Sequence, residues 1–96
     1  MAVTAKNESE NVVYVGSKPL ASYTLAVMTQ FQKGAKEVSL RARGNAIPFA
    51  IIVAETVRKR FDTSIKEGKA RVYAEDLEDS TGRKSLVPII EITLLK

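Results

Sequence analysis

Five basic side chains of the sequence lie in predicted loops or at the ends of predicted strands. They are Lys18, Arg41, Arg43, Arg83 and Lys84. Lysine and arginine at such positions can contact the phosphates of a nucleic acid backbone. The loop after Arg43 also opens a helix, and the free N–H groups at a helix start favour a phosphate. Taken singly, each side chain is better explained as a solvated surface charge. For the set as a whole, binding and solvation are evenly balanced.

The positive charge of the chain is concentrated rather than evenly spread. Fifteen lysines and arginines face eleven aspartates and glutamates, and this net charge of +4 does not by itself identify a nucleic-acid binder. Residues 41–60 carry five basic side chains against one glutamate, whereas residues 61–82 carry three basic side chains against six carboxylates. A concentrated positive region suits a polyanion better than an even scatter does.

Residue types that most catalytic and metal sites need are absent. The chain has no histidine and no cysteine, which excludes Ser-His-Asp and Cys-His triads, zinc sites and disulfides. Carboxylate or lysine chemistry stays open. Gly16-Ser-Lys-Pro19 lacks the glycine spacing of a nucleotide-binding loop. Carboxylates at residues 75–79 could hold a hard cation, but strand alternation sends Glu75 and Asp76 to opposite faces. We expect no enzyme activity, cofactor, metal or small-molecule substrate.

The length and composition are those of a single domain. A chain of 96 residues with 45% hydrophobic and 27% charged residues can bury one two-layer core. We expect a flexible N-terminal tail at residues 1–10 and one domain at residues 11–96. No apolar run approaches the ~20 residues of a membrane span, and the polar N-terminus resembles neither a signal peptide nor a presequence. We therefore expect a cytoplasmic protein without a membrane partner.

Two strands and one helix are predicted in the first half of the chain. The β-branched run at residues 11–16 predicts a buried strand. An amphipathic helix follows, with Ser17 as its cap, Pro19 in its first turn and Gly34 at its end. Its core stripe consists of Leu20, Tyr23, Val27 and Phe31. Alternation over residues 37–42 predicts the second strand.

The second predicted helix, residues 46–61, is apolar on two faces. Asn45 is its predicted cap, and Pro48 falls in the first turn, where its missing N–H costs little. At ~100° per residue, one face should cover the sheet. That face consists of Ile47, Ala50, Ile51, Ala54, Val57 and Phe61. The opposite face consists of Phe49, Ile52, Val53 and Thr56. An apolar second face predicts a partner surface, most simply in a two-fold homodimer. The alternative is a few scattered exposed hydrophobic residues.

The last third of the chain predicts a hairpin and completes a β-α-β-α-β-β order. Residues 69–78 and 86–95 are predicted strands, with Pro88 in the distal arm because proline cannot donate to a ladder. We expect an α/β fold, an α+β two-layer sandwich with two helices on one face of a four-stranded mixed sheet and an extended hairpin. Both strand-to-helix loops then lie at carboxyl ends of parallel strands, so Lys18 and Arg43 should share one edge.

Four segments, in this order and at this spacing, resemble the Alba family. They are Asn11-Val-Val-Tyr-Val-Gly-Ser-Lys-Pro19, Arg41-Ala-Arg-Gly-Asn-Ala-Ile47, Val57-Arg-Lys-Arg-Phe61 and Thr81-Gly-Arg-Lys-Ser85 ahead of Ile89-Ile-Glu-Ile92. No single segment is highly specific, but the resemblance extends from residue 11 to the C-terminus. It implies a compact dimer built by the second helix and the hairpin. It also implies a protein that coats and condenses archaeal DNA with little sequence preference, and many members bind RNA.

The resemblance implies roles for residues of the two loops. Lys18, Arg41 and Arg43 match positions that contact the nucleic acid backbone. Ser17 stands where many relatives have the lysine that is acetylated, so Lys18 would have to replace it as the modification target. Asn45 follows Arg-Gly, where relatives often have another basic residue, and keeps only a polar contact. Each missing charge removes a phosphate contact, which predicts weaker binding than that of the most basic members.

The resemblance also implies roles for the hairpin and the second helix. Arg83 and Lys84 match an arm that reaches along a minor groove. Phe61 matches an aromatic residue through which dimers meet side by side, although periodicity places it on the core face. Phe49 occupies a position that is commonly basic in relatives.

Three classes of function follow, in order of preference. The first is an architectural protein that compacts double-stranded DNA on the chromosome, as a homodimer or as a heterodimer with a paralogue. The second is a member that mainly binds RNA, for RNA stabilisation or as a ribonucleoprotein component. The third is a protein-interaction module, which would bind no polyanion.

Overall fold

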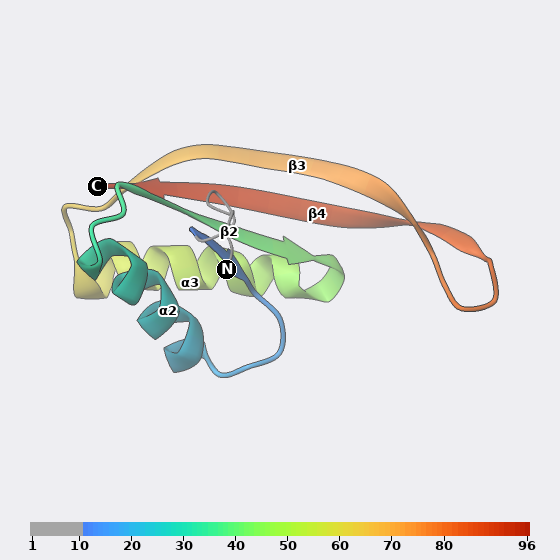
Figure 1. Cartoon of the computed structure of the whole chain (residues 1–96), viewed down its shortest axis with the longest axis horizontal. Coiled ribbons are helices and arrows are strands. Elements are labelled where there is room, and N and C mark those ends of the chain that lie inside the picture. Colours follow the sequence, from blue (N-terminus) through green and yellow to red (C-terminus); the bar gives the residue numbers. More distant parts are fainter. Residues whose placement is uncertain (1–10) are drawn as a thin grey trace.

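The computed structural model describes residues 11–96, which form a four-stranded sheet covered on one face by two helices (Figure 1). The strands are β1 (Val12–Tyr14), β2 (Glu37–Arg43), β3 (Lys66–Glu78) and β4 (Lys84–Leu95), and the helices are α2 (Leu20–Gln32) and α3 (Ile47–Thr56). The predicted element order and the α+β sandwich are confirmed. The predicted tail, residues 1–10, lies outside the described residues. No helix within residues 11–96 is long and apolar enough to span a membrane.

The sheet has the strand order β1-β2-β4-β3. β1 and β2 are parallel, and β4 runs antiparallel to both β2 and β3. Consequently β1, β2 and β3 all run in one direction, and each helix makes a crossover between parallel strands. The sheet is mixed, as predicted.

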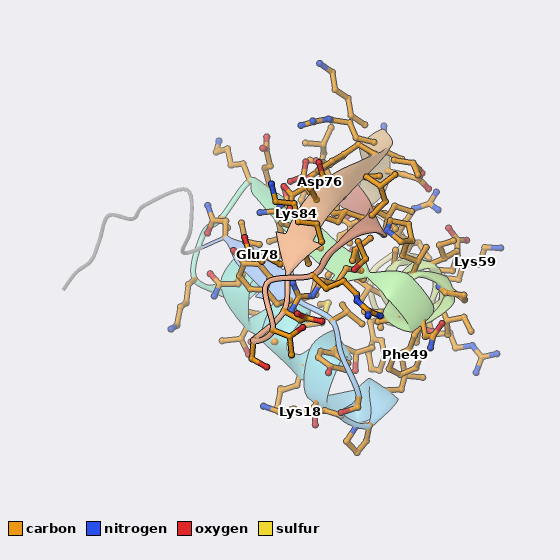
Figure 2. All side chains as sticks on the ribbon, turned by 90° about the vertical axis from the view of Figure 1, so that its right-hand side faces the viewer. Lys18, Phe49, Lys59, Asp76, Glu78 and Lys84 are labelled. Carbon is orange, nitrogen blue, oxygen red and sulfur yellow. The ribbon has the colours of Figure 1, made fainter. Side chains whose placement is uncertain are left out.

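The hairpin of β3 and β4 extends beyond the rest of the sheet. Pairing between β2 and β4 ends at Arg43 and Ile89, whereas β3 and β4 stay paired as far as Glu78 and Lys84. Pro88 is the first residue of β4 past the end of β2, so its predicted place in the distal arm is confirmed. Figure 2 looks at the molecule from the hairpin end, with Lys84 in the sheet layer and Lys18 in the helix layer.

Proline and glycine set the two ends of α2. The helix follows Pro19 as its N-cap, and no side chain caps its first turn. The predicted Ser17 cap is therefore wrong, because Ser17 lies two residues before the N-cap residue. Gly34 has φ +102°, a conformation that glycine adopts without steric cost. Its N–H donates to the carbonyl oxygen of Phe31 at 3.0 Å and closes the helix end.

A short 3-10 turn separates β2 from α3. The turn spans Gly44–Ala46, and Gly44 has φ +58°. Asn45 lies inside this turn and makes no capping hydrogen bond, so the predicted Asn45 cap is wrong. The 3-10 bonding replaces the cap, since the N–H of Ile47 donates to the carbonyl of Gly44. Pro48 lies in the first turn of α3, as predicted.

α3 packs through a face that matches the predicted one in part, since Ala50 and Ala54 are buried as predicted, as is Val57 after the helix. Its buried side chains are Ala50, Val53 and Ala54. Val53 is 0% exposed, so its assignment to the outer face is wrong, and Ile51, assigned to the core, is exposed. The neighbouring helix supplies the reason. The ring of Phe49 meets that of Tyr23 on α2 edge to face, with centroids 5.8 Å apart, and this contact turns the Phe49 and Val53 side inward.

The chain after α3 leaves the α-helical path. Residues Val57–Phe61 form a π turn, which has more residues per turn than an α-helix. The spacing that places Phe61 on the core stripe therefore fails, and Phe61 is 60% exposed. Its predicted core position is wrong. Ile52 on α3 remains 52% exposed, and Thr56 is partly exposed.

The hydrophobic core lies between the two helices and the central strands. Alternate residues of β2 and β4 point toward the helices and are buried. They are Val38, Leu40, Ala42, Ile90, Ile92 and Leu94. Each fully buried Val, Leu or Ile side chain contributes about 1.5–3 kcal/mol relative to exposure. The intervening residues of these strands form the other face of the sheet, which neither α2 nor α3 covers (Figure 1). We call this face the open sheet face.

Candidate nucleic-acid interface

Two loops leave the sheet side by side at the carboxyl ends of β1 and β2. The two strands are parallel neighbours, so the loop with Lys18 and the turn with Arg43 and Asn45 open at one edge. These three residues are exposed, and together with Phe49 they line a groove of about 630 Å3. The shared position of Lys18 and Arg43 is as predicted. We call the surface of Lys18, Arg43 and Asn45 the basic edge.

The two cations of the basic edge can bind an anion. Within residues 11–96, neither Lys18 nor Arg43 forms an ion pair with a carboxylate. Asn45 adds an amide that can donate to a phosphate oxygen. The edge therefore offers two cations and one neutral donor at the end of the sheet, an arrangement suited to the backbone of a nucleic acid.

The hydroxyl of Tyr23 fixes the loop that carries Lys18. Its oxygen accepts the N–H of Gly16 at 2.8 Å and the N–H of Lys18 at 2.9 Å. These two N–H groups already have an acceptor, so the loop can bind an anion only through its other groups. The sequence placed Tyr23 on the core stripe and did not predict this role. The only signal was a tyrosine, rather than a phenylalanine, in a core position just after the loop.

Arg41 does not belong to the basic edge. Its Nε lies 2.9 Å from a carboxylate oxygen of Glu91, and its Nη2 donates to the hydroxyl of Tyr73 at 2.7 Å. Partial burial works to lower the pKa of Arg41, but the hydrogen bond to Tyr73 and the charge of Glu91 outweigh it and raise the pKa. The guanidinium is thus already paired, unlike Lys18 and Arg43. A role in phosphate contact stays a prediction for Arg41.

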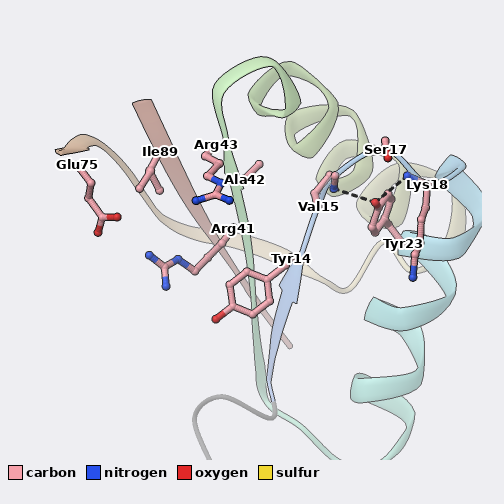
Figure 3. Close-up of a pocket in the computed structure, with 11 residues that line it drawn as sticks. Tyr14, Val15, Ser17, Lys18, Tyr23, Arg41, Ala42, Arg43, Glu75 and Ile89 are labelled. Atoms are coloured by element: carbon pink, nitrogen blue, oxygen red, sulfur yellow. Dashed lines mark hydrogen bonds between the residues drawn. The ribbon is translucent and has the colours of Figure 1, made fainter. Parts of the chain in front are cut away.

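A second pocket, of about 600 Å3, lies around the end of β1. Figure 3 shows Tyr14, Arg41 and Arg43 on one side of β1 and β2, with Glu75 facing them from the hairpin. Lys18 lies on the other side of β1, next to Tyr23 (Figure 3). The pocket therefore connects the open sheet face to the basic edge.

The two cations of the hairpin are far from the basic edge. Arg83 and Lys84 are at the tip of the hairpin, and neither lines the pockets that contain Lys18 and Arg43. Lys84 pairs in register with Glu78, and Asp76 lies on the same arm (Figure 2). The predicted basic tip is therefore flanked by carboxylates.

Asp79 organises the turn of the hairpin. Its Oδ1 accepts the hydroxyl of Thr81 at 2.7 Å and the N–H groups of Thr81 and Arg83 at 2.9 and 3.0 Å. These hydrogen bonds, that of the Thr81 hydroxyl first, lower the pKa of Asp79. Gly82 has φ +85° and completes the turn. Arg83 and Lys84 therefore lie at the end of a turn whose conformation is held by these hydrogen bonds.

An exposed apolar surface runs along α3 and the helix-facing side of the hairpin. Val72 pairs with the buried Ile90 and so shares its side of the sheet, as does Leu86. Val72 and Leu86 are each 71% exposed, and Ile51 and Ile52 of α3 are exposed too. We call these four residues the apolar surface. Phe49, Val53 and Thr56, predicted for a dimer interface, are partly or fully buried within the chain.

The structure is that of a small two-layer α+β sandwich with a basic edge and a long hairpin. The family model described as Alba matches residues 11–70. This chain therefore belongs to the Alba family.

Relatives match over nearly the whole chain. DNA/RNA-binding protein Alba 1 of Archaeoglobus fulgidus is 50% identical over 84 residues, which cover 85% of this chain and 94% of that protein. DNA/RNA-binding protein Alba of Methanocella arvoryzae is 46% identical over 85 residues, 88% of each chain. The solved structure of Alba from Thermoplasma volcanium has a TM-score of 0.83 at 41% identity and covers 90% of this chain and 100% of that one. As a member of this family, the chain is not an enzyme.

Proposed function

We propose that this chain is a DNA- and RNA-binding protein that contacts the nucleic acid backbone through its basic edge. The observation that carries the proposal is the pair of cations, Lys18 and Arg43, that lie at one sheet edge without carboxylate partners in residues 11–96. The names of its relatives, DNA/RNA-binding protein Alba, support the same partner.

The apolar surface supports a dimer as the binding unit. Ile51, Ile52, Val72 and Leu86 are large hydrophobic residues on one side of the molecule, where water contact is unfavourable. A second copy of the chain would cover them through a two-fold axis, since such an interface uses the same surface twice. We therefore propose a homodimer, or a heterodimer with a paralogue that has a similar surface.

The dimer would present two basic edges and two hairpins to one duplex. Backbone contacts by lysine and arginine carry no sequence information, so the protein would coat and compact double-stranded DNA with little sequence preference. The exposed Phe61, the last residue of the basic π turn, is the proposed contact between neighbouring dimers. Such a protein would associate with the chromosome in the cytoplasm.

Substitution of the basic edge tests this function. We expect Lys18→Ala with Arg43→Ala to weaken duplex DNA binding, measured by fluorescence anisotropy at several salt concentrations. The slope of log K against log salt should fall by ~0.9 for each phosphate that the variant no longer neutralises. Lys33→Ala, at the other end of α2, removes an exposed lysine away from the basic edge and is the matched control. Unchanged affinity in the double variant would disprove the basic edge as the contact surface.

RNA is the second candidate partner, because the relatives are named for both nucleic acids. Parallel titrations of duplex DNA and structured RNA at each salt concentration separate the two. A preference for RNA of about tenfold or more at every salt concentration, a difference of about 1.4 kcal/mol, would make RNA the main partner. Binding to neither would leave the protein-interaction module.

A further inference from the structure

The open sheet face carries a well exposed aromatic ring. Tyr14 of β1 is 65% exposed, although it pairs with Arg41 inside the sheet. A second tyrosine of this face, Tyr73 on β3, is half-buried. Its ring is already covered by the guanidinium of Arg71, 4.8 Å from the ring centroid. Of these two rings, Tyr14 is therefore the one that is open to a partner.

Arg41 stands beside Tyr14 as a fixed planar group. Its guanidinium carbon lies 5.9 Å from the centroid of the Tyr14 ring. The carboxylate of Glu91 and the hydroxyl of Tyr73 hold the guanidinium from the other side, at 2.9 and 2.7 Å. Glu91 is itself held by Arg71 at 3.2 Å. Two guanidinium groups thus share one carboxylate, so the cluster keeps a net positive charge. The flat face of Arg41 stays available for stacking.

The pocket of about 600 Å3 joins this pair to a further cation. Tyr14, Arg41, Arg43 and Glu75 line it above the buried Ile89, and Figure 3 shows the first three on the same side of β1 and β2. The volume falls within the ~300–1,000 Å3 of sites that hold small organic ligands. Arg43, which has no carboxylate partner in residues 11–96, supplies a positive charge at the end of the pocket nearest the basic edge.

We propose that this pocket binds an unpaired nucleotide of a single-stranded nucleic acid, with its base on Tyr14 and Arg41 and its phosphate on Arg43. Aromatic rings and arginine planes are the surfaces on which unpaired bases stack. The carboxylate of Glu75 accepts a hydrogen bond from a base N–H or from a ribose hydroxyl. The site goes beyond the proposed duplex contact, because it uses Tyr14 and Arg41 of the open sheet face. Lys18 and Arg43 of the basic edge both line the pocket, but only Arg43 is assigned a contact with the nucleotide.

A duplex cannot use this site in the same way. Its bases are stacked on one another and paired, so their faces do not reach the ring of Tyr14 unless a base is extruded at a cost of a few kcal/mol. The basic edge, in contrast, needs only phosphates. Tyr14 therefore distinguishes single strands from duplexes, and Lys18 does not.

Substitutions of Tyr14 test the proposal. The probes are a short fluorescein-labelled uridine homopolymer, its deoxythymidine counterpart and a labelled duplex. Their affinities for the full chain are measured by fluorescence anisotropy. We expect Tyr14→Ala and Tyr14→Leu to weaken binding of both single strands about tenfold. Duplex binding should stay within about twofold, because phosphate contacts are untouched. Tyr14→Phe keeps the ring and should keep single-strand affinity.

The controls separate stacking from loss of fold. Leu25→Ala removes another exposed hydrophobic residue, on α2, and should change none of the affinities. Tyr14→Leu keeps the apolar bulk of the strand, so a weaker affinity in this variant reports the missing π face. Equal losses on single strands and duplex, or no loss on single strands, would overturn the proposal, as would a wild-type chain that binds only the duplex. Single-strand binding without duplex binding would support it and refute the proposed duplex function.

Discussion

Tyr23 connects the hydrophobic core to the basic edge. Its ring is buried against Phe49, while its oxygen accepts two backbone N–H groups from the loop that carries Lys18. A hydroxyl oxygen has two lone pairs, and both are used here. The backbone of the loop that carries Lys18 is therefore held by one atom of a core residue.

Tyr23→Phe removes that atom and keeps the ring. Two loop N–H groups lose their partner, and a buried unsatisfied group costs about 1–3 kcal/mol. Because these groups are only partly buried, we expect a loss at the lower end of that range and a duplex affinity reduced several-fold. Thermal unfolding and anisotropy measure the two effects. Tyr14→Phe, which removes an exposed hydroxyl, is the control, and equal behaviour of both variants would contradict the role of Tyr23.

Asp62 links stability to pH. Its Oδ2 pairs with Lys96 at 2.6 Å, and its Oδ1 accepts the hydroxyl and N–H of Ser64. The bond to Lys96 first, then those to Ser64, lowers the pKa of Asp62 from 3.8 to about 2. The carboxylate is then more acidic in the folded than in the unfolded chain. Its contribution to stability is full above about pH 4 and is lost as the pH falls through about 2.

The melting temperature across this pH range tests the linkage. We expect Asp62→Asn to be less stable than the wild type at about pH 5 and the difference to vanish toward about pH 2. Lys96→Ala should behave in the same way, because it removes the partner that contributes most. A difference that stays constant across this range would show that the ion pair has no such effect.

Some side-chain neighbours could be predicted from the sequence, and others could not. Lys18 and Arg43 could be predicted as neighbours, because the parallel strand order alone places their loops at one edge. The pairing of Arg41 with Glu91 could not, because it depends on the register between β2 and β4, which the sequence leaves open. An arginine that looks free in the sequence is therefore paired in the fold, with a carboxylate that Arg71 shares.

Among the elements, α3 limited the prediction most. Its ten residues from Ile47 to Thr56 include seven with aliphatic or aromatic side chains, counting the two alanines and excluding proline. A helix that is apolar all round does not indicate which face is buried. The contact of Phe49 with Tyr23 decides the orientation, and it depends on where α2 lies. For the same reason the sequence-based prediction exchanged Val53 and Ile51 between core and surface.

Removing charged side chains from the hairpin should strengthen duplex binding, whereas removing those of the basic edge should weaken it. Asp76 and Glu78 lie close to Lys84 and would repel the phosphates that Arg83 and Lys84 approach. We expect Asp76→Asn with Glu78→Gln to strengthen duplex binding several-fold at low salt, since exposed charge interactions contribute about 0.2–1 kcal/mol each. The gain should shrink as salt screens the charges.

Anisotropy at low and high salt measures this gain. Glu37→Gln, at the start of β2 and away from the hairpin tip, removes an exposed carboxylate and is the control. Asp79 is kept, because it organises the turn. If the double variant and the control bind alike at low salt, the hairpin does not approach the duplex.

For the whole molecule, the apolar surface predicts a dimer that one substitution can disrupt. Ile52→Glu places a charge on the apolar surface, and the chain should stay folded because Ile52 is half exposed. We expect light scattering to give twice the chain mass for the wild type and the single chain mass for the variant. Val53→Glu would instead unfold the core and could not test the interface.

A control at another surface separates assembly from general solubility. Leu25→Glu changes an exposed residue of α2 outside the apolar surface and should leave the dimer intact. A monomeric wild type, or an Ile52→Glu variant of dimer mass, would refute the interface.

The end of β2 divides the hairpin into two mechanical parts. From Ile89 to Leu95, β4 has a neighbouring strand on each side. From Lys84 to Pro88, only β3 lies beside it among the described strands. A two-stranded ribbon is marginally stable on its own in water, so the distal part is the softer one. The width of a minor groove varies with DNA sequence. On the proposed duplex, a compliant end on a stiff base would adapt to such differences in width at low elastic cost, and this bending would add to the sequence tolerance of the backbone contacts.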